Sequence, residues 1–222
     1  SKDARIRLLL SLSANLKVTD WLTLQARGNL DYSADKLRQK FYASTATALC
    51  GMNGRYIEMD YQETQMYGDV MAMVKKQLND FTLDVAIGGS INDRITNSTR
   101  IDSKNASLKY ANVFNLANIV MSSSASIDQK IDAHYQLQSV FATAQIGYKE
   151  GVFLDLTARN DWSSTLAYTK YEKKGFFYPS VGVSFLPDKW VKMPEWVSFS
   201  KLRGAYSIVG NGVPPFITYP VS

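Results

Sequence analysis

The sequence predicts an all-β chain, an antiparallel up-and-down segment of a transmembrane β-barrel that supplies about eight long strands. Three features support this fold class. Apolar and polar residues alternate with a period of two, each alternating stretch is long, and the connections are by turns short and long. The clearest alternation spans residues 5–33, where a polar break at Thr19 and Asp20 separates two arms. Its alternate positions are Ile6, Leu8, Leu10, Leu12, Ala14, Leu16, Val18, Leu22, Leu24, Ala26, Gly28, Leu30 and Tyr32.

The length of these arms favours a membrane barrel over a soluble sheet. A strand of a globular protein averages about 5–6 residues, whereas each arm here keeps its pattern for about a dozen. A strand that crosses a membrane at a tilt needs about 9–11 residues with one unbroken apolar face. The other predicted strands cover about residues 56–76, 81–92, 133–149, 152–162, 177–185 and 198–209.

The connections differ in length according to their order along the chain. The short ones are residues 19–20, 78–80 and 149–151, and the long polar ones are residues 43–54, 96–131 and 163–174. Alternate connections of a meander lie at the same end, so one end carries tight turns and the other carries large loops. Outer-membrane barrels have this asymmetry, with short periplasmic turns and long extracellular loops. The break at residues 187–196 is longer and is expected to hold a helical turn.

Aromatic residues gather toward both predicted ends, as expected for two belts at the membrane interfaces. Near the short turns lie Trp21, Tyr148, Trp190 and Trp196, and toward the long loops lie Tyr32, Phe41, Tyr42, Trp162, Phe176, Phe177 and Tyr178.

Composition excludes several other classes of protein. The 222 residues are 45% apolar, and no run approaches the roughly 18 apolar residues of a membrane-spanning helix. The net charge is +5, but Lys and Arg are scattered, which argues against nucleic-acid binding. The single cysteine, Cys50, and the single histidine, His134, give no disulfide framework, metal cluster or catalytic triad. We therefore expect no enzyme activity, no metal and no cofactor.

Three sequence motifs follow one another between residues 152 and 211. They are residues 156–166 (LTARNDWSSTL), residues 177–185 (FYPSVGVSF) and residues 201–211 (KLRGAYSIVGN). With these motifs in this order, the chain resembles the SusC/RagA branch of the TonB-dependent outer-membrane transporters of the Bacteroidetes. The first 150 residues share the hairpin rhythm of that family but carry no motif as sharp.

The resemblance implies that residues 1–222 are part of a barrel of roughly 22 strands. The plug domain, the TonB-contacting segment and the last barrel strands are expected to lie outside this chain. The implied function is TonB-dependent uptake of an oligosaccharide or a peptide, and the implied localisation is the cell outer membrane. The implied partners are outer-membrane lipid, a SusD-like surface lipoprotein, the TonB complex and the substrate, with no nucleic acid among them.

The sixth predicted strand and the loop after it hold the candidate ligand-binding residues. Arg159 and Asp161 share one face of that strand, where they either contact substrate or form a structural ion pair in the lumen wall. The ion pair is the favoured interpretation. Trp162, Tyr168 and Tyr171 lie in or beside the loop, where their rings either stack on a sugar or belong to the interface belt. The belt is favoured for these three.

Two other classes of protein remain open. A passive porin or adhesin barrel would share the alternation but not the three motifs. A soluble β-sandwich or glycan-binding module would pack the alternating apolar face inward. The direction of five side chains distinguishes a barrel from a sandwich: Leu8, Leu24, Leu83, Leu154 and Val183.

The segment 96–131 carries the main functional prediction. It is rich in Ser, Asn and Asp, and we expect it to be too polar to bury and too long for a mere connector. It is therefore expected to be an extracellular contact surface. Deleting residues 103–126 from the full-length transporter should leave the barrel assembled but lower uptake or lipoprotein binding.

Overall fold

The computed structural model describes residues 1–104, 108–121, 126–167, 174–194 and 196–210. Its regular elements are strands and short 3-10 turns. The strands are β1 (Lys2–Lys17), β2 (Leu22–Phe41), β3 (Arg55–Leu78), β4 (Phe81–Asp102), β5 (Ser126–Tyr148), β6 (Val152–Ser163), β7 (Phe176–Phe185) and β8 (Leu202–Ser207). The 3-10 turns are η1 (Leu116–Asn118), η2 (Ser164–Leu166) and η3 (Pro187–Lys189). Among the described residues, no helix has the length and apolar character to cross a bilayer.

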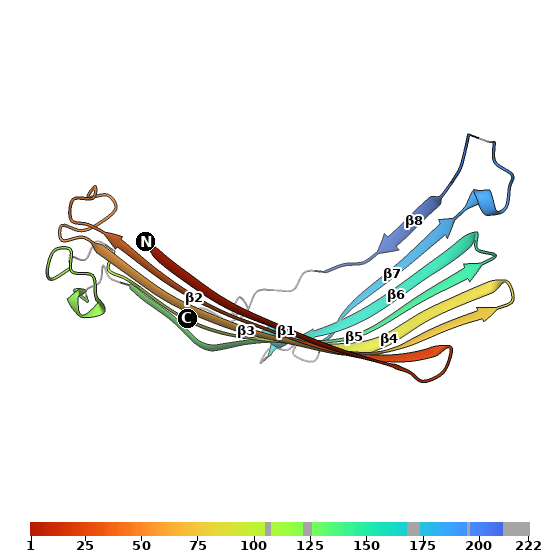
Figure 1. The fold of residues 1–222 in the computed structure, drawn as a ribbon, viewed down its shortest axis with the longest axis horizontal. Coiled ribbons are helices and arrows are strands. Elements are labelled where there is room, and N and C mark those ends of the chain that lie inside the picture. Colours follow the sequence, from red (N-terminus) through yellow and green to blue (C-terminus); the bar gives the residue numbers. More distant parts are fainter. Residues whose placement is uncertain (105–107, 122–125, 168–173, 195, 211–222) are drawn as a thin grey trace. The chain divides into compact units, whose positions relative to one another are not determined.

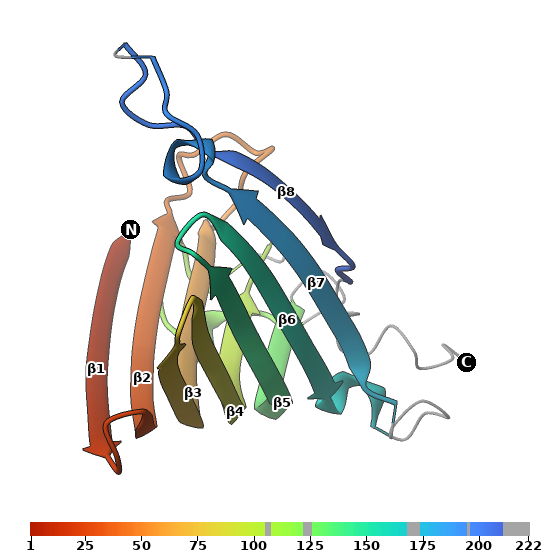
Figure 2. The ribbon, with the colours of Figure 1, turned by 90° about the vertical axis from the view of Figure 1, so that its right-hand side faces the viewer.

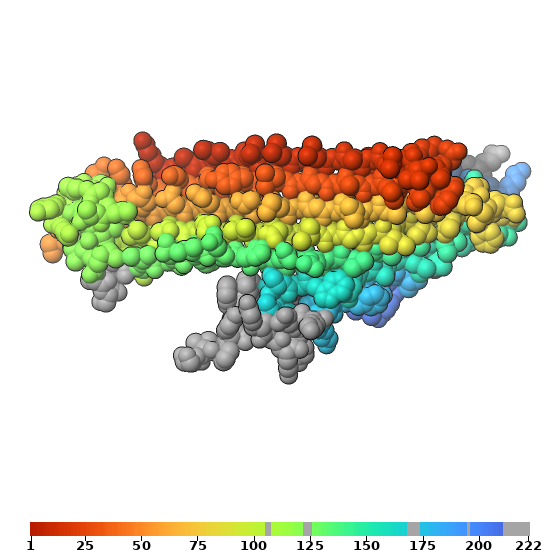
Figure 3. Space-filling model, turned by 90° about the horizontal axis from the view of Figure 1, so that it is seen from below, coloured from red at the N-terminus to blue at the C-terminus, as the bar shows by residue number. Residues whose placement is uncertain are grey.

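The strands form one sheet in the order β1-β2-β3-β4-β5-β6-β7-β8. Figure 1 shows each strand beside its neighbour in the chain, and the bands of colour in Figure 3 follow the same order. β5 pairs with β6, β6 with β7, and β7 with β8, and all three pairings are antiparallel. The predicted all-β meander is therefore confirmed. A sandwich of two packed sheets is wrong for the described residues.

Several strands are longer than a membrane crossing requires. β2, β3, β4 and β5 contain 20, 24, 22 and 23 residues. At a rise of about 3.3 Å per residue, β3 extends for roughly 80 Å, more than twice the hydrocarbon thickness of about 30 Å. Even when tilted, a strand of this length exceeds what a crossing of the hydrocarbon needs.

The structure corrects the predicted loop at residues 96–131. β4 continues to Asp102 and β5 begins at Ser126, so the connection is residues 103–125. The period of two was obscured at Asp132, which has a positive φ of 47°. Before Asp132 the exposed apolar residues of β5, Ile127 and Ile131, have odd numbers. After Asp132 the exposed apolar residue Val140 has an even number, so the alternation shifts by one residue at Asp132. β8 is also shorter than the predicted residues 198–209.

The chain divides into two compact units, which are described separately. The turn half comprises Ser11–Asn29, Met66–Asp93 and Tyr135–Ser222, and the loop half comprises Ser1–Leu10, Leu30–Gln65 and Arg94–His134. Figure 2 faces the turns and shows β1 to β8 side by side at that end.

In the turn half, the strand register gathers the apolar residues on one face, which we call the apolar face. Leu156 of β6 lies between Ala144 of β5 and Val181 of β7, and Val181 in turn pairs with Tyr206 of β8. These side chains are not covered: Leu156, Val181 and Tyr206 are 39%, 40% and 68% exposed. Leu24 and Val183 are likewise exposed, and Leu83 and Leu154 are half-buried. A sandwich would bury them, so their exposure favours a lipid-facing surface.

Tight turns end the turn half. Asn79 in the β3–β4 turn and Lys149 and Glu150 in the β5–β6 turn have φ values of 52°, 48° and 53°. Left-handed backbone of this kind lets two strands reverse with the twist of a hairpin. The β7–β8 connection contains η3, which confirms the helical turn predicted for residues 187–196.

Candidate functional site

The face of the turn half opposite the apolar face carries paired polar side chains, and we call it the polar face. Arg159 Nε donates to Asp161 Oδ1 at 2.6 Å, and Arg159 Nη2 donates to Ser139 Oγ at 2.9 Å. Ser139 pairs with Asp161 in the register of β5 and β6, so Arg159 links the two strands. The predicted structural ion pair is therefore present.

Tyr178 belongs to the same polar cluster. It pairs with Arg159 in the register of β6 and β7 and so lies on the face of Arg159 and Asp161. Phe176 pairs with Asp161 on this face. The prediction that Tyr178 and Phe176 join the lipid-facing belt is wrong, because alternation along β7 places both opposite Phe177. The sequence signal was available, since Tyr178 shares its parity with the polar or small residues Ser180, Gly182 and Ser184.

A second ion pair on the polar face is more deeply buried. Arg27 Nε donates to both carboxylate oxygens of Asp69, at 3.1 and 3.0 Å, and the Asp69 side chain is fully buried. A buried carboxylate needs such a partner, because an unpaired buried charge would be strongly destabilising. Lys75 and Asp84 add an exposed pair at 3.0 Å between β3 and β4. These charged groups of the polar face therefore already have partners.

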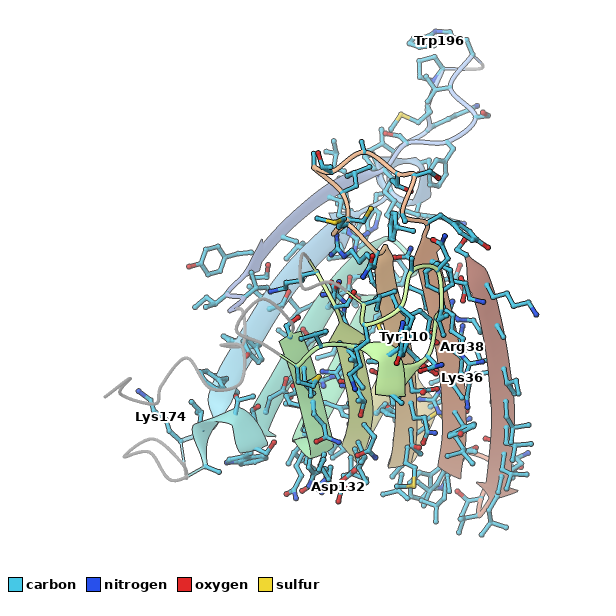
Figure 4. All side chains as sticks on the ribbon, turned by 90° about the vertical axis from the view of Figure 1, so that its left-hand side faces the viewer. Lys36, Arg38, Tyr110, Asp132, Lys174 and Trp196 are labelled. Carbon is cyan, nitrogen blue, oxygen red and sulfur yellow. The ribbon has the colours of Figure 1, made fainter. Side chains whose placement is uncertain are left out.

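In the loop half, β2 becomes polar on both faces, whereas β1 keeps the exposed apolar side chains Ile6, Leu8 and Leu10 on one face. Arg5 and Arg7 of β1 form bidentate hydrogen bonds with Asp35 and Asp31 of β2. Along β2, the even positions are apolar or small from Leu22 to Leu30 but charged at Lys36 and Arg38. Figure 4 labels Lys36 and Arg38, which pair with Asp60 at 3.4 Å and with Glu58 at 2.8 Å. Charged residues in these positions belong in water rather than in hydrocarbon.

The long connection in the loop half builds a small core of its own. Leu108 is fully buried and clusters with Tyr56 and Ile119, and the partly buried Ile101 and Phe114 pack against them. The prediction that this segment is too polar to bury is wrong. Few apolar residues suffice because Tyr56 and Ile101 come from the ends of β3 and β4 and are brought there by strand pairing, which local polarity does not reveal.

Buried polar groups of this connection have partners within it. The Asn118 side chain accepts from the Tyr110 backbone N–H at 2.9 Å and donates to the carbonyls of Tyr110 and Val113 at 2.8 and 2.6 Å. The Asn115 side chain accepts from the Asn118 N–H at 2.9 Å and so caps η1. The Ser- and Asn-rich composition therefore supplies side chains that replace water around the loop backbone.

The two loops of this half are joined to each other. The Asn53 side chain donates to the Leu108 carbonyl at 2.7 Å, and the Asn112 side chain accepts from the Ala43 N–H at 2.8 Å. Phe114 stacks edge-on against Tyr42 with ring centroids 5.1 Å apart. We call the described residues 43–54 and 108–121 the loop cap. It is a folded layer and not two independent connectors.

An ion-pair cluster holds the base of the loop cap. Asp102 is 1% exposed and accepts from Arg55 through both oxygens at 2.8 Å, from Arg100 at 3.0 Å and from the Lys104 backbone N–H at 2.9 Å. Burial alone would raise the pKa of Asp102. The hydrogen bonds from Arg55 and Lys104 and the two guanidinium charges outweigh it and hold that pKa below its ordinary value.

The family follows from comparison with known proteins. The family described as TonB dependent receptor-like, beta-barrel, matches residues 1–212. The chain belongs to this family. A comparison with curated proteins gave no match.

Solved structures agree with the TonB-dependent receptor fold. The RagAB peptide importer in the open-open state matches with 19% identity and a TM-score of 0.73, over 92% of this chain and 22% of that one. RagAB in the closed-closed state matches with the same identity and TM-score, over 95% and 23%. The chain therefore spans less than a quarter of these proteins. These matches agree with the family in showing a TonB-dependent receptor barrel fold, which is the fold that the SusC/RagA resemblance of the three motifs implies.

In this TonB-dependent receptor barrel segment, the predicted ligand-binding residues do not form one group. Arg159 and Asp161 lie on the polar face, whereas Trp162 pairs with Gln138 and shares the parity of Leu156 on the apolar face. Trp162 there lines a hollow with Gly68, Val70, Ile91 and Val140, which suits the favoured belt. Tyr168 and Tyr171 lie outside the described residues. A ligand contact by any of the five stays a prediction.

Cys50 and the described acidic groups are the remaining candidates for metal binding in this segment. Cys50 is a free cysteine buried in the loop cap, with Sγ 3.6 Å from the carbonyl oxygens of Tyr42 and Thr45. Among the residues that the structure describes, no group of three or more His, Cys, Asp or Glu side chains is arranged to hold a metal ion.

Proposed function

We propose that this chain is part of the barrel wall of an outer-membrane transporter that takes up an oligosaccharide or a peptide with energy from the TonB complex. The apolar face would contact outer-membrane lipid and the polar face would line the lumen. The observation that carries the proposal is the combination of both faces in one meander within a family of TonB-dependent receptors. The similarity to RagAB, a peptide importer, supports the same reaction class.

The loop cap is proposed as the surface that meets a SusD-like lipoprotein and the incoming substrate. It exposes large apolar side chains: Leu49, Met52, Tyr110, Val113, Leu116 and Met121. Aromatic and methionine side chains are enriched in protein interfaces. Its core and hydrogen bonds hold these groups in fixed positions, so binding would not have to order a flexible loop first.

Deletion of the long connection from the full-length transporter tests this proposal. The structure moves the deletion boundaries, because Ser103 bonds Tyr56 through both its backbone N–H and its Oγ, each at 3.0 Å. Residues 104–125 should therefore be replaced by a short Gly-Ser linker and Ser103 kept. We expect normal assembly in the outer membrane, because the strand ladder is intact, and reduced uptake or lipoprotein capture.

The double variant Met52→Ser/Tyr110→Ser is the matched control for that deletion. Met52 and Tyr110 are 83% and 72% exposed, so the double variant removes contact surface without opening the loop core. It should lower lipoprotein capture while leaving the cap folded. Normal growth on the cognate nutrient and normal capture by a correctly inserted deletion variant would refute the role of the cap.

A further inference from the structure

The β7–β8 connection, residues 186–201, is longer than the tight turns at the same end of the sheet, of which the β1–β2 turn also exposes Val18 and Trp21. The β3–β4 and β5–β6 turns are only a few residues long and polar, whereas this connection exposes four large apolar side chains, of which Trp190 is 45% exposed. Val191, Trp196 and Phe199 are 61%, 85% and 62% exposed, and nothing in the described part of the chain covers them. Figure 4 labels Trp196. The function proposed above gives this connection no role.

The start of the connection is fixed to the apolar face of the neighbouring hairpin. The Trp190 ring lies 5.7 Å from the Tyr148 ring, which lies 4.8 Å from Phe81. Tyr148 shares its face with Ile146, opposite Leu154. The indole also covers Gly151, where an added Cβ would lie 1.8 Å from Trp190 Nε1. The Leu186 N–H donates to the Gly151 carbonyl at 2.7 Å.

Phe81, Tyr148 and Trp190 thus form a continuous aromatic girdle at the turn end of the apolar face. Lys149 Nζ lies 5.4 Å from the Tyr148 ring and 6.0 Å from the Trp190 ring. Such a girdle marks the level of the lipid headgroups in a membrane barrel. Because Trp190 belongs to it, the exposed residues that follow Trp190 begin at that level.

The composition of the connection matches an interfacial segment. The connection contains three large aromatic residues and three lysines but only two acidic residues. The aromatic residues are Trp190, Trp196 and Phe199, the lysines are Lys189, Lys192 and Lys201, and the acidic residues are Asp188 and Glu195. Tryptophan and phenylalanine favour the boundary between headgroups and acyl chains, and lysine ammonium groups reach the phosphates. If this turn were surrounded by water alone, Trp196 would gain no stabilisation from contact with lipid.

We propose that the described residues 190–194 and 196–201 form an interfacial anchor that contacts phospholipid headgroups of the periplasmic leaflet. Trp196 and Phe199 enter the apolar boundary, and the lysines contact lipid phosphates. This inference rests on the outer-membrane placement of the proposed function but not on transport, TonB or the lipoprotein. The alternative is that another segment of the full-length protein, and not lipid, covers Trp196 and Phe199, and the experiment must distinguish the two.

A nitroxide label at Ser198 tests the anchor without removing its aromatic residues. The full-length protein, with Cys50→Ala and any other cysteine replaced, carries Ser198→Cys and is reconstituted in phosphatidylethanolamine–phosphatidylglycerol vesicles. Collisions of the label with oxygen and with a water-soluble nickel complex report depth. We expect several-fold less nickel collision at position 198 than at Asp20→Cys, whose parent side chain is 98% exposed in the β1–β2 turn.

Two further variants make every outcome informative. Trp196→Ser/Phe199→Ser with the label at position 198 should restore nickel collision to the level of position 20, because the apolar contacts are lost. A label at position 198 that collides with nickel as often as position 20 overturns the anchor. Protection that persists in the double variant also overturns it, because protein and not lipid then covers the segment. A label at Leu156→Cys without oxygen exposure would instead refute the membrane placement itself.

Discussion

The turn half and the loop half use the same strands but meet different surroundings. In the turn half, one face exposes Leu156 and Val181 and the other carries Arg159 and Asp161. In the loop half, alternate positions such as Lys36 and Arg38 become charged, and apolar residues such as Leu108 are instead buried under a loop. Backbone pairing is common to both, so the difference is one of solvent. We infer lipid for the first and, from the charged positions of β2 onward, water for the second, whereas the exposed Ile6, Leu8 and Leu10 of β1 keep the apolar character of the turn half.

The largest expected effect breaks the apolar face of the turn half. Leu156→Arg, near the middle of β6, should lower the free energy of unfolding of the intact barrel in lipid by about 2–4 kcal/mol, because a guanidinium would be placed in hydrocarbon. Thr157→Arg, on the opposite face, should cost much less. Denaturant titration in vesicles measures both variants. Equal losses would show that the two faces have been assigned wrongly.

The next effect belongs to the loop half alone. Leu108→Ala should destabilise the loop cap by about 2–3 kcal/mol, because Leu108 is fully buried against Tyr56 and Ile119. Hydrogen exchange of the Tyr56 and Ser103 amides should accelerate, since those amides are bonded at the base of the cap. The global unfolding of the barrel should stay unchanged. Slow exchange in Leu108→Ala would contradict a core in the cap.

A smaller effect is expected from the charge at the base of the cap. Asp102→Asn should cost about 1–2 kcal/mol of local stability at pH 7, a modest value because Arg55 and Arg100 partly reach water. The folded-state pKa of Asp102 is lowered, so its contribution is complete above the ordinary carboxyl pKa of about 3.9 and is lost as pH falls through the folded value. The difference between wild type and variant in amide exchange should therefore be constant from pH 7 to pH 5. A difference that already shrinks in this range would contradict the ion-pair cluster.

The smallest effect is expected from an exposed ion pair of the loop half. Asp31→Asn removes the partner of Arg7, whose side chain is 56% exposed. Exposed pairs gain little because water solvates both charges when they separate. The unfolding midpoint should not change measurably, and it should not depend on salt. A marked loss of stability would mean that this pair is shielded from water in the intact protein.

The sequence predicted the strands of the turn half better than those of the loop half. Period-two alternation gave the strands of the turn half, because a face in lipid must be apolar at every second residue. The same criterion failed at residues 96–131, where strand faces in water need not alternate and Asp132 shifts the period. Leu108 was missed because its partners, Tyr56 and Ile101, are distant in sequence. Arg159 and Asp161 were found because they are two residues apart on one strand.

Lipid contact along a single strand tests the change of surroundings most directly. β3 runs through both halves, and its even positions pass from Val74, Val70 and Met66 to Thr64 and Asp60. Nitroxide labels at these positions in the reconstituted full-length protein should collide with oxygen at positions 74, 70 and 66. Labels at positions 64 and 60 should collide with the water-soluble nickel complex, with the change falling between Met66 and Asp60. Uniform oxygen exposure along β3, or nickel exposure at Val70, would contradict the account.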